Sequence, residues 1–204
     1  AVGVSALAAN TTGTSNTAIG HYALDANTTT NHVTAIGHNS LSNNVAHENT
    51  AVGSHSSFSN TSGEGNVSVG KTAMYTNTTG SYNTAMGYQA LDHNTTGNQN
   101  VAIGYDALSA CTTAGANVAV GYRAMLASTT GANNVAAGYI ALDSLTTAHG
   151  NVAIGSGALE NQNFTTSTDN YNVGVGYQSG FAITTGVQNT LIGGTAGNAL
   201  TDAD

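Results

Sequence analysis

The chain has 204 residues, of which only 6% are charged, and it contains no proline and no tryptophan. Its polar residues are mainly Asn, Thr, Ser and Gly, which favour turns and short strands and disfavour a helical protein. Lys71 and Arg123 are the only permanent cations against ten carboxylates. Such a chain cannot neutralise a run of phosphates, which excludes nucleic acid and anionic membrane surfaces as direct partners.

Other sequence features set further limits. Cys111 is the only cysteine, so an intrachain disulfide is excluded and a buried thiol is expected. No apolar run approaches the roughly 18 residues of a membrane helix, so we expect no membrane insertion. The sequence starts in the middle of a repeat and without Met. We therefore expect it to be a piece of something longer.

The chain is built from successive copies of one repeat of 17 residues. Numbered from its Asn, the unit at 83–99 reads NTAMGYQALDHNTTGNQ, and the next begins NVAIGYDALSA. Of the eleven spacings between the repeated glycines, nine are 17, one is 16 and one is 21. We predict a single repeat domain over 1–204, with coils starting near 16, 33, 49, 66, 83, 100, 117, 134, 151, 172 and 189. After Gly3, the glycines at position 5 are Gly20, Gly37, Gly53, Gly70, Gly87, Gly104, Gly121, Gly138, Gly155, Gly176 and Gly193.

Each position of the unit has a physical interpretation. Positions 2 and 4 are mostly β-branched, which suits a pleated, buried surface, and position 3 between them is small and points the other way. Gly at position 5 permits a bend or a close backbone approach. Positions 8 and 9, usually Ala and Leu, predict a second short strand, and the Asn-Thr-Thr-Gly that follows predicts a turn. The position-1 asparagines are expected to form a hydrogen-bonded stack, at Asn49, Asn66, Asn83, Asn100, Asn117, Asn134 and Asn151.

These features predict an all-β fold, a parallel β-solenoid (a β-helix or β-roll) of about twelve 17-residue coils. A helix is the competing interpretation of a short apolar run, but glycines and paired threonines leave it no room. Because the first strand is apolar on both faces, we expect something to cover the face that carries the small position-3 residues. A parallel homotrimer is the predicted solution. The alternative is a monomer with an exposed Ala stripe.

The repeats at 16–31, 83–99 and 100–115 resemble those of phage and virus tail-fibre proteins. They are similar, more distantly, to the head repeats of trimeric autotransporter adhesins, although the 17-residue unit is longer than the roughly 14-residue unit of those heads. The resemblance covers essentially the whole chain. It implies a homotrimeric, extracellular attachment fibre on a virion or a cell surface, with a host glycan or protein as a further partner.

A row of tyrosines at position 6 is the candidate ligand-binding feature, because aromatic rings can contact sugars or a partner surface. Its alternative role is to shield the seam between coils. If the chain binds a ligand, the irregular turns at 43–48 and 160–171 are also places to look. His21 and His38 share position 6 one coil apart, so their rings should lie about 5 Å apart. We predict no metal site there. The candidate residues are Tyr88, Tyr105, Tyr122, Tyr139 and Tyr177.

We predict no catalytic site and no cofactor, because the acids are scattered and only Asp25, Asp92, Asp143 and Glu160 share an outward-looking position 10. The expected function is that of a structural and attachment segment of an extracellular fibre. One alternative is a self-assembling filament or surface component without a receptor. Another is an ice-binding solenoid that presents ladders of threonine. Asn-x-Ser/Thr sequences at Asn10, Asn27, Asn60, Asn77 and Asn94 would be glycan acceptors in a eukaryotic secretory chain and turn residues otherwise.

Overall fold

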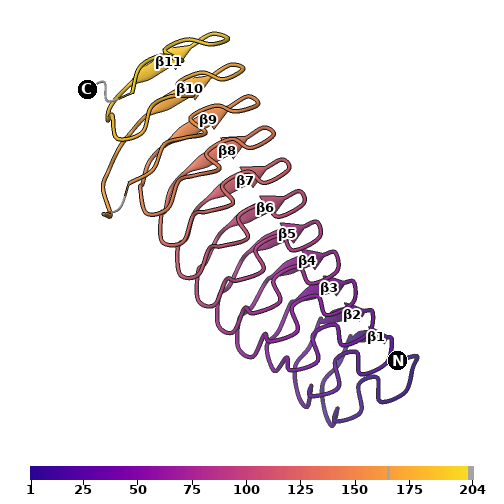
Figure 1. Cartoon of the computed structure of the whole chain (residues 1–204). Coiled ribbons are helices and arrows are strands. Elements are labelled where there is room, and N and C mark those ends of the chain that lie inside the picture. The colour runs from indigo at the N-terminus through magenta and orange to yellow at the C-terminus, as the bar shows by residue number, and fades with distance from the viewer. Residues whose placement is uncertain (165, 202–204) are drawn as a thin grey trace.

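The computed structural model describes residues 1–164 and 166–201 as a stack of coils that forms a parallel β-solenoid, as the repeat predicts (Figure 1). No helix occurs among these residues, and therefore none that could cross a membrane. Each coil contributes one three-residue strand. The strands are β1 (Thr17–Ile19), β2 (Thr34–Ile36), β3 (Thr50–Val52), β4 (Val67–Val69), β5 (Thr84–Met86), β6 (Val101–Ile103), β7 (Val118–Val120), β8 (Val135–Ala137), β9 (Val152–Ile154), β10 (Val173–Val175) and β11 (Thr190–Ile192).

The strands pair in sequence order, so that β1 lies at one end of a parallel 11-stranded sheet and β11 at the other (Figure 1). The register is constant: Val101 pairs with Val118 and Ile103 with Val120, and a bridge from Val2 to Ile19 adds a further coil at the start. The 16- and 21-residue units keep this register, because β3 and β10 pair position for position with their neighbours. Changes in unit length are therefore absorbed in the turns.

Glycine at position 5 is required by geometry. Its φ lies between +124° and +149° in the eleven glycines from Gly20 to Gly193, a region that L side chains rarely adopt. A Cβ on Gly104 would also overlap the carbonyl oxygen of Gly121 in the next coil. From Gly20 to Gly176, each of these glycines thus permits both the bend after the strand and the close approach of successive coils.

The prediction for the two faces of the strand was wrong. The small position-3 residues, such as Ala102 and Ala119, are fully buried inside the coil, where they need no partner chain to cover them. The position-4 side chains, such as Ile103 and Val120, point outward and are exposed. The physical reason is the narrow coil. Because a large Leu enters from the opposite wall, the interior has room only for a small residue such as Ala from the strand.

That opposite wall is not the second strand that the sequence predicts. Positions 7 and 9 have left-handed backbone, as at Gln89 (φ 54°) and Leu91 (φ 54°), and the segment forms turns. The adjacent Ala90 and Leu91 are consequently both buried, whereas neighbouring residues of a strand would point to opposite faces. The wall is still tied to the next coil, since the Leu91 N–H donates to the carbonyl of Ala107 (3.0 Å).

Two asparagine ladders line the interior. At position 1, the side-chain Oδ1 of Asn100 accepts the backbone N–H of Asn117 (3.1 Å), and its Nδ2 donates to the carbonyl of Ala114 (2.9 Å). At position 12, a ladder that we did not predict from the sequence joins Asn94 to Asn77 (2.7 Å). The same position-1 backbone contact recurs in adjacent coils at Asn49, Asn66, Asn83, Asn100, Asn117, Asn134 and Asn151, each of which is buried.

Candidate binding surface along the tyrosine row

The position-6 tyrosines lie on the outer surface, just after the glycine that ends each strand. Four of them form one continuous stack. The ring centroids of Tyr88 and Tyr105 are 5.4 Å apart, and those of Tyr105 and Tyr122 and of Tyr122 and Tyr139 are 5.3 Å apart, with interplanar angles of 10–17°. The spacing follows the coil repeat, because each ring rests on the equivalent ring of the next coil.

This stacking changes what the row can offer to a ligand. Inside the stack, both faces of Tyr105 and of Tyr122 are covered by neighbouring rings. A sugar cannot lie flat on these faces and would meet ring edges and hydroxyl groups instead. Open ring faces therefore occur only where the stack ends or is interrupted.

At its N-terminal end the stack is closed by a cation. The Lys71 ammonium lies 5.9 Å from the centroid of the Tyr88 ring, within the range of a cation–π contact. Tyr177 does not join the stack, because the position-6 residue between it and Tyr139 is Ser156. The structure thus brings together Tyr88, Tyr105, Tyr122 and Tyr139, and leaves Tyr177 two coils away from Tyr139.

Toward the N-terminus, position 6 is Lys71 and Ser54 before it becomes His38 and His21, and His55 lies at position 7. The rings of His21 and His38 are 5.4 Å apart, close to the predicted spacing, and His55 follows at 5.0 Å from His38. Burial lowers the pKa of His55, and the neighbouring His38 and Lys71 add to this effect. Ser54 and Asn39 contact the two ring nitrogens of His55 at 2.9 and 3.2 Å. In the described part of the chain, no three His, Cys, Asp or Glu side chains are grouped to hold a metal ion.

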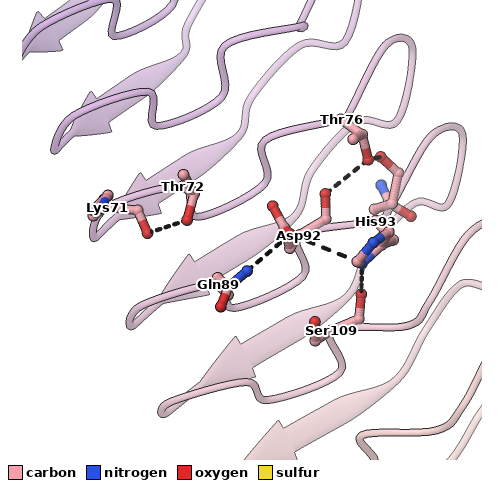
Figure 2. Close-up of polar contacts among 8 residues, drawn as sticks. Lys71, Thr72, Thr76, Gln89, Asp92, His93 and Ser109 are labelled. Atoms are coloured by element: carbon pink, nitrogen blue, oxygen red, sulfur yellow. Dashed lines mark hydrogen bonds and ion pairs between the residues drawn. The ribbon is translucent and has the colours of Figure 1, made fainter.

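The acids at position 10 are less exposed than the sequence suggested. Figure 2 shows Asp92 beside Gln89 (3.5 Å) and His93 (3.9 Å), with the His93 ring against the carbonyl of Ser109 (3.0 Å). Burial raises the pKa of Asp92, although His93 opposes this. The prediction of an outward-looking position is therefore wrong for Asp92, whose side chain is largely covered.

The threonine-rich turns also differ from the ice-binding interpretation. At position 13 the hydroxyl groups are used inside the protein: Thr78 donates to the carbonyl of Thr95 (3.0 Å), and Thr95 to that of Thr112 (3.0 Å). Position 14, as at Thr96 and Thr113, is exposed, and so are some position-13 threonines, such as Thr28 and Thr61. The glycan interpretation also fails for the buried position-12 amides, at Asn27, Asn60, Asn77 and Asn94.

The irregular turns carry no enclosed site. In the shortened unit, His47 accepts the backbone N–H of Asn31 through Nδ1 (3.1 Å) and remains exposed. In the lengthened unit, Ser167 contacts His149 of the preceding unit (2.6 Å). Among the residues that the structure describes there is no pocket. A ligand would have to bind on the outer surface.

Cys111 lies inside the coil as expected, where burial raises the pKa of its thiol to about 11. Comparisons of the chain with protein-family models, with curated proteins and with solved structures found no match. Function is therefore argued below from the geometry of the surface.

Proposed function

We propose that this chain is a rod segment of an extracellular attachment fibre, carried by a virion or a cell, in which three parallel copies pack along the outer face of the sheet. The observation that carries the proposal is the outer stripe, which we define as the side chains at positions 2 and 4 of β1 to β11. It contains only Thr, Val, Ile, Met and Ala. Its exposed members include Ile19, Met86, Ile103, Val120 and Ile154.

A second copy of the same chain is the partner that fits this stripe. Parallel sheets normally have both faces covered, and within one copy only the Ala face is covered, by the wall that carries Leu91. Although each chain has a formal net charge of −8, positions 2 to 4 contain no charged residue, so the copies do not repel one another there. Rotational symmetry places identical positions of the repeat side by side along the whole rod.

The molar mass in solution tests the association. Light scattering after size exclusion should give about 61 kDa, three times the 20.3 kDa of the chain. Ile103→Glu together with Ile154→Glu should lower this mass, because a carboxylate on the stripe would be buried against another copy. Thr113→Glu, on an exposed turn, is the matched control and should leave the molar mass unchanged. A wild-type mass of 20.3 kDa would overturn the proposal.

The attachment role has a separate test. Sequencing the gene on both sides of this segment should reveal a distinct, non-repeating tip that can contact a host. If only further repeats are found and the mass grows without limit as concentration rises, the chain is instead a filament that binds itself.

A further inference from the structure

The tyrosine row is interrupted at one point within the regular sheet. Ser156 lies directly between Tyr139 and Tyr177, because the Gly157 N–H donates to the carbonyl of Tyr139 (2.9 Å) and the Gln178 N–H to that of Ser156 (2.9 Å). The strands stay in register here, with Val152 paired to both Val135 and Val173. Two coil steps separate the flanking tyrosines by about 10 Å.

The exposure of the tyrosines shows that the missing ring leaves open faces. Tyr88, Tyr105 and Tyr122 are 40%, 46% and 43% exposed, whereas Tyr139 and Tyr177 are 55% and 58% exposed. Tyr139 has a stacked neighbour only on the side of Tyr122. Its other face and one face of Tyr177 border the space above Ser156.

The floor and rim of this gap are small and polar. Ser156 leaves room where the preceding coil has Tyr139, and Gly157 stands where that coil has Ile140. A Cβ on Gly157 would lie 3.1 Å from Oε2 of Glu160 and 3.2 Å from Cγ of Gln178. The Glu160 carboxylate and the Gln178 side chain thus occupy the space over Gly157, next to Ser156 in the chain.

A ring centred in the gap would lie about 5 Å from each tyrosine, which is within the 4.5–7 Å at which rings pack. A pyranose suits it better than an aromatic ring does, because its C–H groups can pack on both tyrosines while its hydroxyls bond the polar rim. A neutral sugar is favoured, since the Glu160 carboxylate lies beside Gly157, and Arg123, the cation that acts on Glu160, is paired with Asp143 (3.5 Å).

We propose that the gap between Tyr139 and Tyr177 is a binding site for one neutral pyranose ring, with Ser156, Glu160 and Gln178 as its polar contacts. This deepens the attachment role proposed above by naming its ligand class. The site lies within a single chain, so it does not depend on the number of copies in the fibre.

The experiment is a titration of the protein with the methyl pyranosides of glucose, galactose and N-acetylglucosamine, and saturation-transfer NMR measures their binding. We expect at least one to bind the wild-type protein with a Kd on the order of 1 mM. Ser156→Tyr completes the tyrosine stack and should weaken binding about tenfold or more while the protein stays folded. Tyr139→Ala, which removes one wall, should also weaken it.

The matched control is Gly194→Tyr. It places a ring on the far side of Tyr177, at a glycine whose added Cβ would meet no atom within 4 Å, and it leaves the gap open. Binding should be unchanged in this variant and in the Ile103→Glu, Ile154→Glu variant, which separates the sugar site from self-association. The proposal is overturned if no pyranoside binds at 50-fold above the expected Kd, roughly 50 mM. It is also overturned if Ser156→Tyr binds as the wild type does, or if phenol binds in the gap and no pyranoside does.

Discussion

The serine coil, which we define as Ser56 and Ser57 together with Ser68 of the following unit, and the coil at Leu91 share one backbone arrangement and differ in what fills the interior. Around Leu91 the core is apolar and belongs to a cluster that runs from Ala73 to Ile183. At the serine coil this cluster ends, and a smaller one from Ala18 to Ala51 lies beyond it. Three hydroxyls fill the break: Ser56 and Ser57 donate to the Ser68 hydroxyl at 2.7 and 2.8 Å.

The comparison indicates that two separable sets of interactions hold the rod. The backbone bonds between coils continue through the break, where the Ser57 N–H donates to the carbonyl of Ala73 (2.9 Å), as the Leu91 N–H does to Ala107. The side-chain core does not continue. A substitution that strains the backbone should therefore act equally in both regions, and a core substitution should not.

The largest expected effect is the loss of a position-5 glycine. Gly70→Ala and Gly104→Ala should each lower the free energy of unfolding by about 3 kcal/mol or more, because both combine a strained φ with overlap on the next coil. Urea denaturation measures this. Gly194→Ala, where an added Cβ would meet no atom within 4 Å, is the control and should change stability by less than about 0.5 kcal/mol. A large difference between Gly70→Ala and Gly104→Ala would contradict a shared backbone role.

Core truncation should distinguish the two regions. Leu91→Ala removes a fully buried side chain from the continuous cluster and should cost about 2–5 kcal/mol. Ser57→Ala, at the same position of the repeat, removes one hydrogen bond and should cost about 1 kcal/mol. If urea denaturation gives equal losses of unfolding free energy for the two variants, the interior of the serine coil contributes as much to stability as the apolar interior does.

Filling the break should join the two clusters. The combined change Ser56→Ala, Ser57→Leu and Ser68→Ala removes all three hydroxyls together, so no donor is left unpaired, and it places Leu between Leu41 and Met74. We expect a gain of about 1–2 kcal/mol in thermal or urea unfolding, from one newly buried Leu. A loss of stability would show that the serine coil is too narrow for this side chain.

The smallest expected effects come from pH, and they have opposite signs in the two regions. Because burial lowers the pKa of His55 below 6.5, the unfolded chain binds the proton first, and stability should fall as pH falls from 6.5 through the folded pKa. Because burial raises the pKa of Asp92 and Asp143 above 3.8, stability should rise as pH falls through their folded values toward 3.8. His55→Gln should remove the first change and Asp92→Asn should reduce the second, in urea unfolding measured at a series of pH values.

The sequence predicted most of the architecture because a 17-residue period allows few solutions. Identical positions must stack, so the parallel register, the column of glycines and the 5.4 Å spacing of His21 and His38 follow from the repeat. It did not predict the second asparagine ladder, although Asn at position 12 recurs visibly from Asn10 to Asn94. The turn signal of Asn-Thr-Thr-Gly hid it, because Asn is common in turns for local reasons.

The sequence by itself determined the coil, its period and the residues that share each row. Only the tertiary structure decided which way the rows point, because inside and outside depend on where the chain bends between strands. Left-handed residues at positions 7 and 9, such as Gln89 and Leu91, turn two neighbouring side chains inward, and no alternation rule for strands reveals this. The same bend places the Ala row inside and the Ile and Val row outside. It therefore determines which face of the rod is free to meet another chain.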